Sequence, residues 1–141
     1  MKLLLSLTIL LSPALQARIG DTPDQCDKRY GPPISISEQS RFYQKDTWGI
    51  AVKFADGIAS TVTFNKGRSK FLTPREIGLL LDKNKLGGTW DHQGRGPGES
   101  RHWGNWQESL HATVAMQGET QILVIIRHLD SMEDEGALKD F

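Results

Sequence analysis

Thr22-Pro23-Asp24-Gln25 and Thr73-Pro74-Arg75-Glu76 are two copies of one helix start, and they decide how the chain is expected to fold. In each copy threonine stands at the N-cap, proline at the first helical position, and Gln or Glu three residues after the cap. This arrangement is a capping box with the proline that helices favour in their first turn. It predicts a helix over residues 23–30, ended by Gly31-Pro32-Pro33, and a second helix over residues 74–84.

A hairpin is expected between these helices, because apolar and polar residues alternate on both sides of Ala55-Asp56-Gly57. A three-residue loop with a left-handed glycine would pair Phe54 with Ile58. That register places the apolar side chains of both strands against one core, so we expect it rather than a two-residue Asp-Gly loop. Residues 34–45, which precede the hairpin, are expected to be extended.

A second hairpin is expected near the end of the chain, over residues 110–117 and 121–129 with a turn at Gly118-Glu119. The stretch from Ile122 to Ile126 is apolar on both faces. This pattern is typical of a central strand, or of a strand whose back is covered by another element or subunit. The chain is therefore expected to have an α+β fold of two helix-plus-hairpin halves, with the helices packed on an antiparallel sheet.

The start of the chain has the layout of a secretory signal peptide over residues 1–17: a basic residue, Lys2, then about nine apolar residues and a small residue, Ala17, at the expected cut. The apolar run is too short to cross a bilayer, which needs roughly 20 such residues. We expect export to the periplasm or the extracellular space. Residues 18–129 are expected to form a single α+β domain, and residues 130–141 an acidic, frayed tail.

Charge and cysteine content narrow the classes of partner. Removing residues 1–17 takes away one charged side chain, that of Lys2, and leaves 16 basic and 17 acidic side chains, a net charge of about −1. This balance argues against nucleic acid, which requires a basic face. Cys26 is the only cysteine, so no disulfide can form within the chain. It is expected either to be buried in the first helix or to form a bridge to another molecule.

The opening of the expected mature chain resembles known exported domains. Gly20-Asp21-Thr22-Pro23, then Gln25-Cys26 and Tyr30-Gly31-Pro32-Pro33, are similar to the start of SmpA/BamE-type domains. Two α-then-β halves also resemble the β-lactamase-inhibitor-protein architecture, and the whole chain resembles small uncharacterised bacterial secreted proteins. The chain lacks the lipobox cysteine of the first family and the paired disulfides of the second. The resemblance implies a non-catalytic role in protein binding or assembly.

The segment from Trp90 to Trp106 is unusual in composition, because three of the four tryptophans and two of the four histidines lie in it among several glycines. The glycines of this segment are four, Gly94, Gly96, Gly98 and Gly104. One interpretation is a mobile loop that presents aromatic faces and an arginine to a ligand. The other is that the tryptophans fold inward as core anchors and the glycines form turns. The ligand-binding residues expected under the first interpretation are Trp90, His92, Arg101, His102, Trp103 and Trp106.

Two pairs of histidines are candidate metal ligands. His92 and His102 have carboxylates nearby, but their spacing matches no strong ligand pattern. His111 and His128 are expected on one face of the second hairpin, as diagonal neighbours. We expect no metal site from these patterns, and no catalytic residue, because the chain has neither a nucleophile elbow nor a phosphate-binding loop.

The sequence thus predicts an exported, non-catalytic binding or assembly module that has no cofactor, no nucleic-acid partner and no transmembrane span. Its partner is expected to be another protein or a glycan. Two alternatives stay open. One is a small secreted metal-dependent enzyme that uses the loop histidines. The other is a homodimeric structural module, suggested by the doubly apolar stretch from Ile122 to Ile126.

Overall fold

A computed structural model describes residues 18–67 and 71–130, which form two helices and eight strands. The earlier part of the chain forms α1 (Pro23–Tyr30), β1 (Ser35–Ile36), β2 (Ser40–Lys45), β3 (Trp48–Ala55) and β4 (Ile58–Asn65). The later part forms α2 (Pro74–Lys83), β5 (Asp91–Arg95), β6 (Arg101–Asn105), β7 (Leu110–Gln117) and β8 (Thr120–His128), with short 3-10 turns at Pro97–Glu99 and Trp106–Glu108. No helix in these two ranges is long and apolar enough to cross a bilayer.

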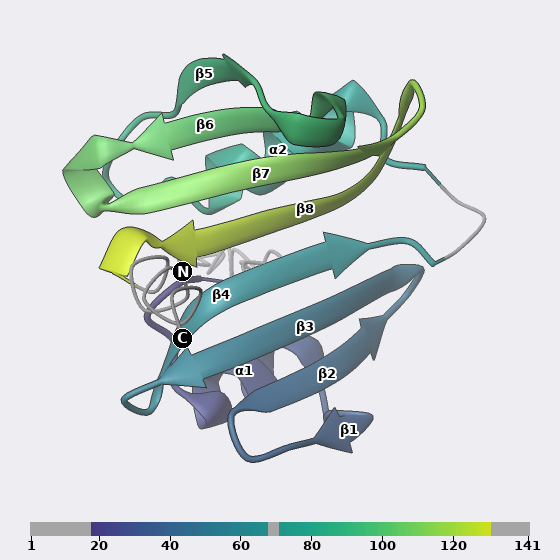
Figure 1. Cartoon of the computed structure of the whole chain (residues 1–141). Helices are drawn as coiled ribbons and strands as arrows, with labels where there is room; N and C mark the ends of the chain where they lie inside the picture. The colour runs from purple at the N-terminus through teal and green to yellow at the C-terminus, as the bar shows by residue number, and fades with distance from the viewer. Residues whose placement is uncertain (1–17, 68–70, 131–141) are drawn as a thin grey trace, which may run out of the picture.

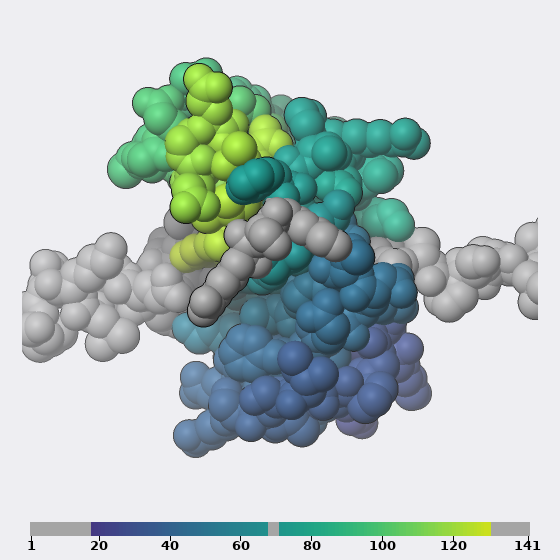
Figure 2. Space-filling view, turned by 90° about the vertical axis from the view of Figure 1, so that its right-hand side faces the viewer, coloured from purple at the N-terminus to yellow at the C-terminus, as the bar shows by residue number. Residues whose placement is uncertain are grey.

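All eight strands belong to one antiparallel sheet, in the order β1-β2-β3-β4-β8-β7-β6-β5 (Figure 1). The last strand of each half, β4 and β8, therefore meet in the middle of the sheet. Figure 2 shows the same division from the side, with the purple and blue residues below and the green and yellow residues above. The predicted fold class, two helix-plus-hairpin halves, is wrong. Each helix is followed by four strands, and these form one large sheet.

Both helices pack on the same face of this sheet (Figure 1). Tyr30 at the end of α1 and Leu80 of α2 line one small cavity together with Ile50 and Phe64 of the sheet. The ring of Tyr30 also lies 5.1 Å from that of Tyr43 on β2. The core is the layer of apolar side chains between helices and sheet, and its most buried members are Val52, Val62, Leu110, Ala112, Val114, Val124 and Ile126.

The two predicted helix starts are confirmed. At α1 the Thr22 hydroxyl accepts from the Gln25 amide, and the Gln25 side chain accepts from the Thr22 amide. Thr73 and Glu76 exchange the same pair of bonds at α2. These bonds satisfy amides that a helix leaves without an intrahelical partner at its first turn. The predicted ends are also confirmed, because α1 stops at Tyr30 before Gly31 and α2 is capped by Asn84.

The predicted loop of the first hairpin is wrong. The turn has two residues, Asp56 and Gly57, which both have positive φ (52° and 77°), as this tight hairpin turn requires. The register that buries both apolar sets is restored by a bulge, in which Ser60 is an extra residue without a cross-strand partner. The Ser60 hydroxyl donates to the Lys53 carbonyl across the bulge. The resulting pairs are Phe54–Ala59, Val52–Val62 and Ile50–Phe64.

The second predicted hairpin is present as β7 and β8, and β8 is a central strand because it pairs with both β4 and β7. This position agrees with the predicted central strand. The described helices cover the face of Val124 and Ile126, whereas Leu123 and Ile125 lie on the other face and are partly buried. The expected pairing of its histidines is wrong. His128 is opposite Leu110, whose side chain is fully buried on the helix-covered face, whereas His111 is opposite Arg127 on the other face. His111 and His128 therefore lie on opposite faces of the sheet.

Candidate functional site

The Trp90–Trp106 segment forms two strands rather than a loop. β5 and β6 pair with each other through Asp91–Gly104 and Arg95–Arg101, and β6 pairs with β7. Because neighbouring side chains along a strand point to opposite faces, the sheet separates the six predicted ligand-binding residues. It does not bring them together as one surface. Ligand binding by any of these six residues remains a prediction.

Four of the six residues lie on the side of the sheet that carries the helices. Trp103 is opposite the buried Ala112 and is partly buried itself, and the His92 ring meets it edge-on at 5.1 Å. The Trp90 indole N–H donates to the Leu81 carbonyl of α2 at 2.7 Å, which anchors this tryptophan against the helix. Arg101 takes the same face by register. Trp90 and Trp103 thus match the second interpretation, in which tryptophans anchor the core.

The other two residues, His102 and Trp106, lie at the face that the described helices leave uncovered. Trp106 is 53% exposed and its indole lies against Gly104, where a Cβ would come within 2.4 Å of it. His102 lies beside His111 of β7, with their ring centroids 5.3 Å apart. Burial, followed by the charges of His102 and Arg127, lowers the pKa of His111. This face therefore carries one exposed indole and a pair of neighbouring imidazoles.

A chain of hydrogen bonds joins this imidazole pair, and with both rings neutral it assigns one tautomer to each. The Ser100 hydroxyl donates to the Pro97 carbonyl at 2.9 Å, so it accepts from His102 Nε2 at 2.8 Å. His102 Nδ1 is then an acceptor for the Thr113 hydroxyl, at 3.4 Å. Thr113 in turn accepts from His111 Nδ1 at 3.5 Å. The lone pair of His111 is left on Nε2.

The structure separates the two histidines that the metal-dependent alternative requires. His92 is opposite Trp103 and packs against it, whereas His102 is opposite Thr113 on the other face. Within residues 18–67 and 71–130, no group of three or more His, Cys, Asp or Glu side chains is placed to hold a metal ion. The described residues thus offer His92 and His102 no shared ion.

Cys26 is buried, as one of the two sequence-based interpretations expected, with 1% of its surface exposed. Burial, and after it the charge of Asp21, raises the pKa of the Cys26 thiol to about 11. A thiolate is the form that attacks substrates, and little of it exists near neutral pH at this pKa. Cys26 therefore acts as a small core side chain of α1.

A cleft opens where the two halves of the sheet separate. β4 and β8 are paired from Thr61–Arg127 to Asn65–Leu123, and the residues of β4 that precede Thr61 do not pair with β8. Ala59 of β4 is bonded to the segment before α1 instead. The Gly20 amide donates to the Ala59 carbonyl at 2.8 Å, and the Ala59 amide donates to the Asp21 carbonyl at 2.7 Å. The backbone groups at the cleft wall are thus satisfied without β8. The separation of β4 from β8 at this end of the sheet therefore leaves no cost of unsatisfied hydrogen bonds at Ala59.

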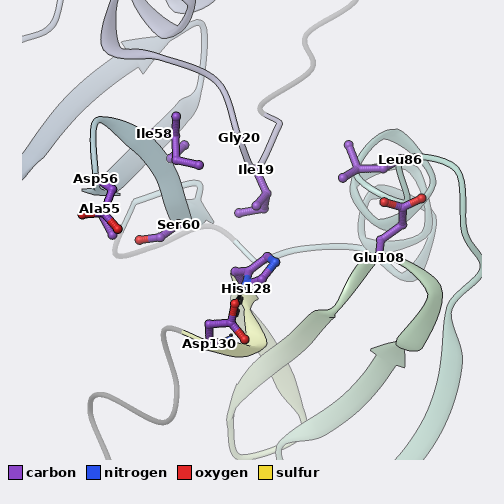
Figure 3. A pocket seen from close by; sticks show the side chains of 11 residues that line it. Ile19, Gly20, Ala55, Asp56, Ile58, Ser60, Leu86, Glu108, His128 and Asp130 are labelled. Carbon is purple, nitrogen blue, oxygen red and sulfur yellow. Dashed lines mark hydrogen bonds and ion pairs between the residues drawn. The ribbon is translucent and has the colours of Figure 1, made fainter.

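The cleft is a cavity of about 420 Å³, a size within the range of small-molecule sites. Both halves of the chain line it. Figure 3 shows Ile19 in the middle, Asp56, Ile58 and Ser60 on one side, Leu86 and Glu108 on the other, and His128 and Asp130 at the end of β8. Its lining is mainly apolar, formed by Ile19, Gly20, Ala55, Ile58, Ala59 and Leu86.

Leu86 is held in the cleft wall under backbone strain. It has a φ of 54°, in the left-handed region that residues with a Cβ rarely adopt, and its side chain is 40% exposed. The loop that carries it is fixed by Asn105, which is fully buried and donates to the Lys85 carbonyl at 2.8 Å. Asn105 lies against Gly88, where no Cβ would fit. Strain that positions an exposed apolar side chain is a feature of binding sites.

The polar groups of the cleft are three carboxylates, a histidine and a serine. Glu108 accepts from the Gly87 amide at 3.2 Å, which ties it to the loop of Leu86. His128 Nδ1 lies 3.3 Å from the Asp130 carboxylate and accepts from the Asp130 amide at 3.4 Å. Asp56 lies in the β3–β4 turn. Among the described residues that line the cleft, none is lysine or arginine.

No pattern in the sequence predicts this cleft. Its lining comes from five separate segments, residues 19–20, 55–60, 86, 108 and 128–130, and none of them carries a motif. The one feature that could have drawn attention is an apolar Leu86 next to Gly87-Gly88, directly after a helix end, where a polar turn residue is usual.

Comparison with known proteins finds no counterpart. No protein-family model matches the chain, no curated protein matches it, and no solved structure matches it. The function is therefore argued from the geometry of the described residues.

Proposed function

We propose that this protein is an exported, non-catalytic binding module whose ligand enters the cleft between the two halves of the sheet. The observation that carries the proposal is the cleft itself, about 420 Å³, where β4 turns away from β8 to bond the segment before α1. Apolar pockets with a few polar groups are the usual form of a ligand site. Ile58 and Leu86 supply exposed apolar surface on opposite walls.

A binding role is favoured over a catalytic one because the serine and one of the carboxylates of the cleft already have structural partners. The Ser60 hydroxyl donates to the Lys53 carbonyl, and Glu108 accepts from the Gly87 amide. A serine nucleophile would instead be bonded to a base. Cys26, the only thiol, is buried in α1.

Export is part of the proposal and rests on the signal-like sequence of residues 1–17, which lies outside the described residues. Expression of the full chain in a bacterium followed by amino-terminal sequencing tests it. We expect the mature chain to begin at Arg18. An intact Met1 in the cytosolic fraction would contradict export. A protein or glycan partner and a homodimer, both expected from the sequence, remain predictions.

Binding at the cleft can be tested with hexan-1-ol, a neutral probe with a short apolar chain. The purified protein is titrated and its backbone amides are followed by NMR. We expect the largest shifts at Gly20, Ala59 and Gly87, which surround the cleft. Shifts centred on Trp106 and His102 would contradict the proposal and favour the open face of the sheet.

A pair of variants separates cleft binding from general affinity for apolar surface. Ile58→Ser removes an apolar side chain from the cleft wall, and Ile34→Ser removes one that is 69% exposed elsewhere. We expect Ile58→Ser to weaken hexan-1-ol binding about fivefold, because burial of each methylene contributes about 0.8 kcal/mol. Ile34→Ser is expected to leave it unchanged. Equal effects of the two substitutions would contradict the proposal.

A further inference from the structure

We propose that the ligand of the cleft is a small organic ammonium ion, in which one cationic group is attached to an apolar body. This inference rests on the proposed function, since it names the chemistry of the molecule that the same cleft would bind. It is carried by how charge and apolar surface are distributed over the cleft lining.

The negative charge of the lining comes from three separate elements. Asp56 lies in the β3–β4 turn, Glu108 in the 3-10 turn before β7, and Asp130 at the end of β8. His128 Nδ1 lies 3.3 Å from the Asp130 carboxylate and balances its charge when the imidazole is protonated, whereas the described residues that line the cleft include no lysine or arginine to neutralise Asp56 and Glu108 there. Three carboxylates around one cavity attract a cation and repel an anion.

The geometry holds one of these carboxylates in place. Glu108 Oε1 accepts from the Gly87 amide at 3.2 Å, next to Leu86 on the same wall. Figure 3 shows the Glu108 carboxylate beside the Leu86 side chain, so a charged and an apolar contact are offered together. A ligand that carries its cation next to a hydrocarbon body would use both contacts at once.

The size of the cleft favours a small molecule. About 420 Å³ is enough for a compact organic molecule and lies near the lower end of ligand pockets. The apolar part of the lining, which includes Ile19, Ala55 and Ala59, is suited to hydrocarbon, and the Ala59 amide and carbonyl, which an extended peptide would pair with, already bond Asp21 and Gly20. We therefore assign the cation to a free amine rather than to a lysine side chain of a protein.

Three probes of equal length test the assignment: hexylammonium, hexan-1-ol and hexanoate. Each is titrated into the purified protein, and the amide shifts of Gly20, Ala59 and Gly87 give the affinity at the cleft. We expect hexylammonium to bind about tenfold more tightly than hexan-1-ol, since each partly exposed charge pair contributes up to about fivefold. Hexanoate is expected to bind more weakly than the alcohol.

Matched carboxylate variants show whether the charge acts from within the cleft. Glu108→Gln keeps the acceptor for the Gly87 amide but removes the charge, so it should weaken hexylammonium about threefold and leave hexan-1-ol unchanged. Asp46→Asn removes a charge from the β2–β3 turn, which does not line the cleft, and should change neither affinity. Equal loss from both variants would overturn the assignment.

The outcomes separate this inference from the proposed function. If hexan-1-ol binds at the cleft but hexylammonium binds no more tightly, the cationic assignment is overturned and cleft binding stands. If a short peptide, acetyl-Gly-Lys-Gly-amide, binds more tightly than hexylammonium, the small-molecule assignment is overturned in favour of a protein ligand. If no probe shifts the cleft amides, both proposals are overturned.

Discussion

The contact between Gly88 and Asn105 gives the sharpest prediction about how the cleft wall is built. A Cβ on Gly88 would lie 2.1 Å from Asn105 Oδ1 and 2.9 Å from its Cγ, both far inside van der Waals contact. Both residues are buried, so the Asn105 amide cannot simply swing into solvent. Gly88→Ala should therefore push the loop of Leu86 away from β6.

The magnitude follows from the contacts on each side. Overpacking of this kind costs about 2 kcal/mol of unfolding free energy. Asn105→Ala should cost about 1 kcal/mol, because the Lys85 carbonyl loses the Asn105 donor but keeps the Gly88 amide at 2.9 Å. In the double variant the alanine at 88 meets no amide, so the total should stay near 1 kcal/mol rather than reach about 3 kcal/mol.

Urea unfolding of the four proteins in this cycle measures the coupling, which we expect to be about 2 kcal/mol. Gly78→Ala is the control, because a Cβ at this exposed site of α2 meets nothing within 4 Å and alanine favours the helix. It should stabilise by about 1 kcal/mol. Additive effects of Gly88→Ala and Asn105→Ala would refute the packing that holds Leu86 in the cleft wall.

Three further predictions concern the α1 side of the fold. Thr22→Ala removes the N-cap of α1 and should cost about 1 kcal/mol in urea unfolding, whereas Thr22→Ser should cost much less. Tyr43→Phe should lower the free energy of unfolding by about 1–2 kcal/mol, because it removes the hydroxyl that donates to Asp27 at 2.7 Å. A decrease of less than about 0.3 kcal/mol in thermal unfolding would contradict this bond. The pKa of Cys26 is raised by burial from 9.0 to about 11, so the unfolded chain loses this proton first, and stability should fall between these pH values; Cys26→Ala should abolish that part of the pH dependence.

Local chemistry made part of the fold predictable. The capping boxes at Thr22 and Thr73 locate both helices, because the bonds they form join residues only three positions apart. The position of β8 in the middle of the sheet also follows from its sequence. Apolar residues at successive positions favour a strand with neighbours on both edges, although the described helices cover only the face of Val124 and Ile126 and leave Leu123 and Ile125 partly exposed on the other.

The strands that the sequence did not reveal are polar ones near the sheet edge. β5 and β6 carry glycines and charged residues, so they lack the alternation of apolar and polar residues that is typical of a half-buried strand. Trp103 is the one large apolar side chain of these two strands on the buried face. The register of the first hairpin was missed for a related reason. A two-residue turn places the apolar residues of both strands on one face only if Ser60 forms a bulge. The residues around Ser60 carry no sequence pattern that predicts a bulge.

The cleft lies beyond sequence reasoning because it is a property of where two strands stop pairing. The segment before α1 bonds Ala59 and thereby ends the β4–β8 ladder at Thr61. Residues 20 and 59 are far apart in the chain, and no pattern in either segment specifies the other. The predicted site residues were chosen for composition, and the sheet divides them between its two faces.

A crystal structure of the protein with hexylammonium bound is the measurement that tests the central claim most directly. We predict density for the hexyl chain between Ile58 and Leu86, with the nitrogen within about 4 Å of a carboxylate oxygen of Glu108 or Asp56, the distance of an ion pair. A ligand seated on the open face beside Trp106, with the cleft closed by its own side chains, would contradict the account.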